Sequence, residues 1–150
     1  MGLYYDDQQY RQMSQGTPSS SLINDILDSV KGEATGVDFY GRLAEAAPTP
    51  QMREDLLRIR QDEHDHFQMF SQLYTQLTGT QPVFQITPVQ FHSFRQGLQM
   101  AYRDELEDYE KYRNFYLMTH DQTLRDIFFR PFSDEIKHAV RIGFMETSLR

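Results

Sequence analysis

A five-residue motif that occurs twice constrains this chain more than any other feature of its sequence. Asp62-Glu63-His64-Asp65-His66 and Asp134-Glu135-Ile136-Lys137-His138 both read D-E-x-x-H, and they lie 72 residues apart. The same shift pairs other identical residues: Glu33 with Glu105, Tyr40 with Tyr112, Arg53 with Arg125 and Arg58 with Arg130. The chain therefore contains an internal repeat, in which a lone glutamate precedes each E-x-x-H by 30 residues.

Four stretches carry apolar residues at the alternating three- and four-residue spacing of one helix face. Capping residues and prolines predict helices that start at Ser19-Ser20-Ser21, at Thr49-Pro50, at Thr87-Pro88 and near Asp121. Two of these helices are near-copies of the other two. The pattern predicts an all-α protein, a four-helix bundle made of two αα-hairpins.

Two local features modify this bundle. Pro131 lies inside the fourth predicted helix and is expected to kink it one turn before Glu135. Residues 79–87 lack a helical pattern, and Val83, Phe84 and Ile86 suggest an extended connection that lies against the helices.

Composition limits the classes of protein to consider. The 150 residues fit one domain, which we place at 20–150 after a flexible, Gln- and Tyr-rich tail at 1–19. The net charge of −7 argues against a nucleic-acid surface, and the lack of cysteine excludes thiolate-bound metals. We see no signal peptide and no apolar run near the ~20 residues of a membrane helix, so a cytoplasmic protein is expected.

Acidic side chains interrupt each apolar helix face at mid-length. Burying several carboxylates together is unfavourable, because they cannot all stay ionised without cations. Two divalent ions would neutralise four glutamates and leave two neutral imidazoles as further ligands. We therefore predict that six residues hold two metal ions: Glu33, Glu63, His66, Glu105, Glu135 and His138.

This doubled pattern resembles the ligand set of the ferritin-like di-iron carboxylate proteins, over about residues 20–150. The chain looks like a rubrerythrin-type or bacterioferritin-type domain without a rubredoxin module. The resemblance implies a ferritin-like bundle with up-down-down-up topology, in which residues 79–87 cross between the hairpins. It also implies two iron ions, with manganese as the alternative.

The resemblance further assigns a role to each ligand. It gives each ion one glutamate and one histidine, Glu33 with His66 and Glu105 with His138, and two bridging glutamates, Glu63 and Glu135. Asp62 and Asp134, which precede the bridging glutamates, would accept the histidine N–H groups and fix their tautomers.

For several residues near the predicted ligands, the sequence is compatible with two different roles. Asp108 lies one turn after Glu105, where rubrerythrins place an additional carboxylate ligand; it is either a seventh ligand or solvent-facing. Its repeat counterpart is Gly36, which either leaves room for a small molecule or serves close packing. Tyr40 and Tyr112 either pack in the core or hydrogen-bond to ligand glutamates. His64, His92 and His120 are expected at the surface, as are Glu107, Glu110 and the ion-pairing Arg58 and Arg130.

The expected function is that of a di-iron oxidoreductase that reacts with O2 or hydrogen peroxide, as a ferroxidase or a peroxidase in oxidative stress. A metal-stapled structural or interaction protein without turnover is the alternative, and iron storage is a third. The electron donor is not identifiable from the sequence, and we expect a homodimer.

Overall fold

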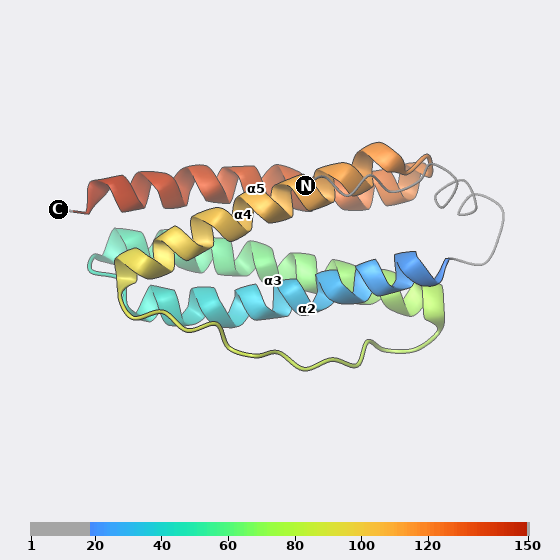
Figure 1. The fold of residues 1–150 in the computed structure, drawn as a ribbon, viewed down its shortest axis with the longest axis horizontal. Helices are drawn as coiled ribbons and strands as arrows, with labels where there is room; N and C mark the ends of the chain where they lie inside the picture. Colours follow the sequence, from blue (N-terminus) through green and yellow to red (C-terminus); the bar gives the residue numbers. More distant parts are fainter. Residues whose placement is uncertain (1–18, 150) are drawn as a thin grey trace.

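The computed structural model describes residues 19–149, which form four long helices. These are α2 (Ser20–Glu45), α3 (Pro50–Thr78), α4 (Phe94–Met118) and α5 (Gln122–Ser148). Helices α2 and α3 pack as one antiparallel hairpin and α4 and α5 as another (Figure 1). The predicted ferritin-like four-helix bundle is therefore confirmed. The predicted tail lies outside the described residues except for Ser19, so its boundary stays a prediction.

Side-chain caps fix where the helices start. At each N-terminus a side-chain oxygen accepts the backbone N–H three residues further on, at Ser19 (3.3 Å), Thr49 (3.2 Å), Ser93 (3.1 Å) and Asp121 (2.9 Å). Helix α3 ends at Gly79, whose φ of 74° is the left-handed conformation that glycine adopts without strain. Pro131 is buried within α5, and the helix continues through it.

The predicted start of the third helix is wrong by about two turns. The chain stays non-helical past Thr87-Pro88, and α4 begins only after Ser93, so the crossover comprises residues 79–93. Contacts with α2 hold this segment extended: the Val89 carbonyl accepts a 2.9 Å hydrogen bond from Arg42, and the Phe91 ring packs on Phe39 at 5.5 Å.

The longer crossover explains the topology. It runs back along the whole bundle, so α3 and α4 point in the same direction and the order is up-down-down-up (Figure 1). Residues 87–93 are needed for this, because nine extended residues span only ~30 Å whereas α3 is ~43 Å long. Phe84 and Ile86 are partly buried as expected, but Val83 is 88% exposed.

The apolar core is divided into two clusters. One lies toward the α2–α3 turn and includes Leu43, Leu56, Leu98 and Ile142. The other lies toward the opposite end and includes Ile26, Phe70, Phe115 and Phe128. Each helix carries one glutamate of the predicted site. Along each helix this glutamate lies between residues of one cluster and residues of the other. Each end of this polar layer is thus closed by packed side chains. No helix within residues 19–149 is long and apolar enough to cross a membrane.

Candidate metal centre

All six predicted ligands converge in the polar layer between the two apolar clusters. Their donor atoms form two groups in which every atom lies within 4.8 Å of the others: Glu33, Glu63, His66 and Glu135, and Glu63, Glu105, Glu135 and His138. Each group contains one glutamate and one histidine of its own, and both groups contain Glu63 and Glu135. The predicted assignment, in which each ion has one glutamate and one histidine of its own and shares two bridging glutamates, requires this overlap.

The two histidines are oriented by aspartates from the opposite hairpin. His66 Nε2 lies 2.9 Å from Asp134, and His138 Nε2 lies 2.9 Å from Asp62. With Nε2 engaged in this way, each ring directs Nδ1 into the cluster. His66 Nδ1 lies 3.1 Å from Glu135 Oε1, and His138 Nδ1 lies 3.1 Å from Glu135 Oε2. A carboxylate that holds the remote ring nitrogen is common behind metal-binding histidines.

The two tyrosines also reach across the bundle. The Tyr40 hydroxyl on α2 donates to Glu105 on α4, and the Tyr112 hydroxyl on α4 donates to Glu33 on α2. Both tyrosines are almost fully buried. Of the two interpretations left open by the sequence, hydrogen bonding to the glutamates of the cluster is therefore the one observed, alongside core packing.

Burial and mutual repulsion make it unfavourable for the carboxylates of the cluster to be ionised together when no metal is bound. Burial raises the pKa of Glu63, and the charges of Glu105 and Glu33 raise it further. Burial likewise raises the pKa of Glu105 and that of Glu135. These carboxylates therefore tend to hold protons until a cation replaces them.

The histidines respond to the same surroundings in the opposite sense. Burial alone would lower the pKa of His66, but the adjacent carboxylates of Asp134, Glu135 and Glu33 outweigh it and raise the pKa to about 12. Hydrogen bonding to His138 holds the pKa of Asp62 well below its usual range. The raised pKa favours a positively charged imidazole at His66, which offsets part of the carboxylate charge that a metal ion would neutralise.

The residues fit a bound metal by a second criterion, the presence of buried polar atoms that lack hydrogen-bond partners. Among the described residues five such side-chain atoms occur, and four belong to this cluster: Glu33 Oε2, Glu63 Oε1, His66 Nδ1 and Glu135 Oε1. Buried polar atoms without a partner are costly, and a cation bound by these ligand atoms, in place of the protons of the cluster, would satisfy them together. Oxygen and imidazole donors suit iron or manganese.

The remaining predicted residues lie outside the cluster. Asp108 forms a 2.5 Å ion pair with Lys111 and belongs to neither donor group, so the structure does not bring it to the metal position. Gly36 lies directly beside Glu63, because a Cβ atom there would be 2.5 Å from Glu63 Oε2. The space left by this glycine is thus occupied by the carboxylate itself.

The residues expected at the surface mostly lie there. His92, His120, Glu107 and Glu110 are exposed, and Arg58 and Arg130 form ion pairs with Glu54 and Asp65. His64 is partly exposed and lies near the Phe67 ring, away from the cluster.

Comparison with known proteins identifies the family. The family model for rubrerythrin matches residues 25–142, which include all six predicted ligands. The chain belongs to the rubrerythrin family. A curated relative, the uncharacterized protein YhjR of Bacillus subtilis (strain 168), is 32% identical over 119 residues, covering 79% of this chain and 82% of its own length.

A solved structure shows the same fold as this rubrerythrin-family chain. It belongs to a hypothetical protein from Pyrococcus furiosus and superposes with a TM-score of 0.77, covering 85% of this chain and 89% of that one. Sequence identity between the two is 19%, so this likeness concerns the fold alone.

Sequence reasoning missed one residue that the structure places behind both histidines. Lys137 Nζ lies 2.7 Å from Asp134 and 3.1 Å from Asp62, so one ammonium group bridges the two aspartates. The i,i+3 spacing of Asp134 and Lys137 could have indicated the first contact. The contact with Asp62 depends on how the hairpins of this rubrerythrin-family bundle pack, which no local pattern reveals.

The crossed aspartate–histidine pairs lead to a prediction that distinguishes the two ions. We expect Asp62→Ala to weaken the ion held by His138, on the opposite hairpin, by about 10- to 100-fold, because that ring loses its orienting acceptor. The ion held by His66 should bind nearly as before. Metal titration followed by imidazole NMR resonances measures both sites, and Asp134→Ala should give the reverse pattern. Equal weakening of the two ions in Asp62→Ala would contradict the crossed assignment.

Proposed function

We propose that this protein is a di-iron oxidoreductase that reacts with O2 or hydrogen peroxide. The observation that carries the proposal is the pair of overlapping donor groups, which share Glu63 and Glu135 and are buried between two apolar clusters. Two Fe(II) ions held this way would supply two electrons together, the number needed to reduce hydrogen peroxide to water. Membership of the rubrerythrin family supports iron as the metal.

In this proposal the side chains of the protein bind, orient and isolate the metal pair. Glu33 with His66 and Glu105 with His138 would each hold one ion, and Glu63 and Glu135, which belong to both donor groups, would be shared between the two ions. Asp62 and Asp134 hold the imidazole rings, and the Tyr40 and Tyr112 hydroxyls hold the terminal glutamates. The apolar clusters on both sides exclude water from the ends of the site.

The first test is metal stoichiometry followed by turnover. Anaerobic titration with Fe(II) is expected to show a break at two ions per chain, and peroxide should then be consumed with near-UV absorption of the ferric product. With an added reductant such as ascorbate, the loaded protein should consume peroxide over many cycles.

Zn(II)-loaded protein is the matched control, because zinc can occupy the same donors but cannot change oxidation state. A titration that ends at no ion or one ion would refute the di-iron site. Full loading with no turnover would instead favour the structural alternative, in which the metals only staple the bundle. The homodimer and the cytoplasmic location stay predictions.

A further inference from the structure

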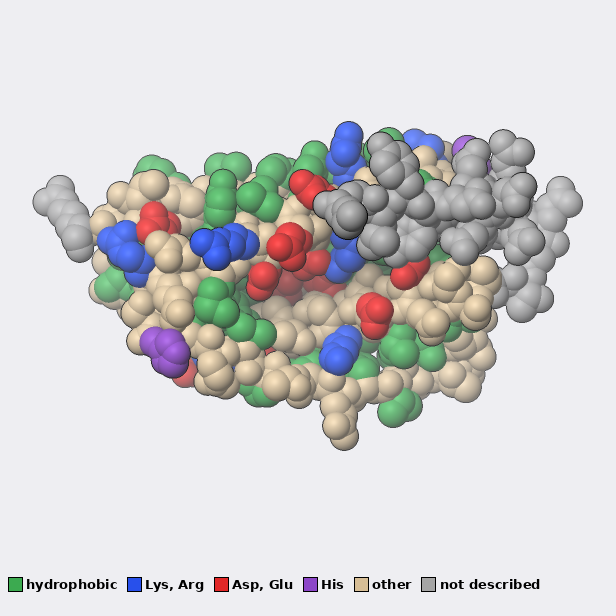
Figure 2. Space-filling view, in the orientation of Figure 1, with side chains coloured by type: hydrophobic (Ala, Val, Ile, Leu, Met, Phe, Trp, Pro, Cys, Tyr) green, Lys and Arg blue, Asp and Glu red, His purple; other side chains and the backbone are tan. Residues whose placement is uncertain are grey.

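The long face between α2 and α4 contains the pocket that leads to the cluster. This pocket has a volume of about 330 Å³ and reaches from the surface to Glu63, Glu105 and Tyr40. The apolar clusters close the two ends of the polar layer, so access along the bundle axis is blocked. Figure 2 shows acidic side chains gathered around a hollow near the middle of this face.

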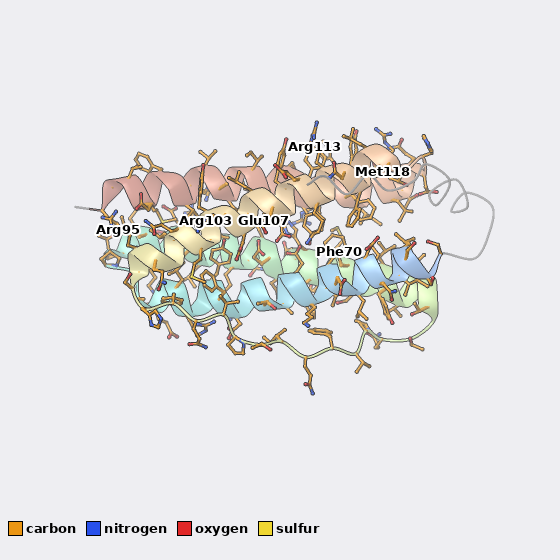
Figure 3. The ribbon with its side chains drawn as sticks, viewed as in Figure 1. Phe70, Arg95, Arg103, Glu107, Arg113 and Met118 are labelled. Atoms are coloured by element: carbon orange, nitrogen blue, oxygen red, sulfur yellow. The ribbon has the colours of Figure 1, made fainter. Side chains whose placement is uncertain are left out.

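The rim of the pocket carries an excess of negative charge. Asp28, Asp104 and Glu107 line it and are exposed, and within residues 19–149 none of them forms an ion pair. Glu107 lies near the middle of α4 (Figure 3). Asp108 also lines the pocket but is neutralised by Lys111. Among the described residues that line the pocket, Lys31 is the one cation opposing the other three acids.

The inner end of the pocket reaches a glutamate that has one unsatisfied, buried oxygen atom. Glu63 lines the pocket, its side chain is 7% exposed, and its Oε1 has no hydrogen-bond partner. Gly36 lies beside the same carboxylate, with no side chain to separate Glu63 from the pocket. Carboxylates therefore line this pocket from its exposed rim to the bridging position.

The opposite side of the cluster has a different charge pattern. There Asp62 and Asp134 are engaged by the histidines and by Lys137, and Arg130 bonds Asp65 at 2.9 Å. Both basic side chains come from α5, and in these ion pairs they neutralise carboxylates that would otherwise attract a cation to that side. The two faces of the site thus differ in charge although the ligands themselves are nearly symmetric.

We propose that the pocket between α2 and α4 is the route by which divalent cations reach the buried donors, and that Asp28, Asp104 and Glu107 speed their arrival. The proposal rests on the proposed function only in requiring that the cluster binds divalent metal. A field of like charge over a concave site raises the local concentration of the opposite ion and its association rate. The rim acids should therefore control the rate of metal uptake and leave the chemistry of the loaded site unchanged.

The test is the rate of Co(II) uptake by the metal-free full chain, followed by visible absorption after rapid mixing. The double variant Asp28→Asn/Glu107→Gln should load about 3- to 10-fold more slowly than wild type at low ionic strength. The difference should nearly vanish at about 0.5 M salt, where charges are screened within a few ångströms. Lys31→Gln should load faster, by about two-fold, because it removes the opposing cation.

The matched control is Glu110→Gln/Asp126→Asn, which removes two exposed carboxylates that do not line the pocket. It should load at the wild-type rate, and all variants should bind the same final amount of cobalt. Equal slowing in the rim and control variants would overturn the route, as would loss of a bound equivalent in the rim variant. If the rim governs cobalt uptake but iron-loaded protein does not turn over peroxide, the proposed function fails and the route stands.

Discussion

Glu63→Ala is expected to reduce the metal content of the fully loaded protein from two ions per chain to at most one. Glu63 belongs to both donor groups, so its removal takes a ligand from each ion and leaves Glu135 as the only bridge. Two cations a few ångströms apart repel each other strongly in a buried site unless carboxylates lie between them. Metal analysis after dialysis against excess Fe(II) under anaerobic conditions measures the outcome.

Two further variants sharpen this prediction. Glu110→Ala removes an exposed carboxylate on α4 and should retain both ions. Glu33→Ala removes a ligand from one donor group only, so the ion at His138 should keep its affinity. A Glu63→Ala protein that still binds two ions with unchanged affinity would refute the bridging role.

The free energy of unfolding of the metal-free protein is expected to fall as the pH rises from about 5 to about 8. Burial raises the pKa of Glu63, Glu105 and Glu135 above the ordinary value of 4.5, so the folded protein keeps protons that the unfolded chain releases in this range. Stability decreases with pH wherever the folded state binds more protons. The loss is about 1.4 kcal/mol per pH unit for each group that differs fully between the states.

Other groups act in the same direction or outside this range. The pKa of His66 rises from 6.5 to about 12, so its contribution is complete below pH 6.5 and is lost as the pH rises through the folded value. The lowered pKa values of Asp62 and Asp134 matter only below about pH 4, where stability is lost as the pH falls.

Chemical denaturation at a series of pH values tests this expectation with and without metal. Saturating divalent metal should replace the protons and remove most of the decline, while adding about 4 kcal/mol at a thousand-fold excess over Kd. Glu63→Gln/Glu135→Gln removes two of the titrating carboxylates and should flatten the metal-free profile. A metal-free wild type whose stability stays constant or increases between pH 5 and 8 would contradict the raised pKa values.

Much of this molecule could be predicted from the sequence because the repeat and the helix pattern reinforce each other. The spacing of Glu33, Glu63 and His66, doubled at Glu105, Glu135 and His138, placed all six side chains on buried helix faces at one height. Local capping chemistry at Thr49-Pro50 and Gly79 determined where α3 begins and ends. These features depend on residues close in sequence or on an exact repeat.

The start of α4 could not be predicted, because Thr87-Pro88 and Ser93 both carry capping signals. The choice between them depends on the contacts of Val89 and Phe91 with α2 and on the distance that the crossover must span. The pocket could not be predicted for a similar reason: Asp28 and Glu107 are 79 residues apart and meet only when α2 and α4 are assembled. In the sequence alone they are ordinary surface acids.

The tyrosines and aspartates that hold the predicted ligands lie on the opposite hairpin from the ligand that each of them contacts. This arrangement has a consequence for how such a chain can arise. A single hairpin carrying one glutamate, one tyrosine and one D-E-x-x-H could pack on an identical copy about a two-fold axis. Each tyrosine would then contact the glutamate of the other copy, and each aspartate would contact the histidine of the other copy. The same crossed contacts are observed between the two hairpins of this chain. Fusing the copies through residues 79–93 would need no new contact at the metal centre. It would free the halves to diverge, as they have at Gly36 and Asp108, and at Asp65 and Lys137.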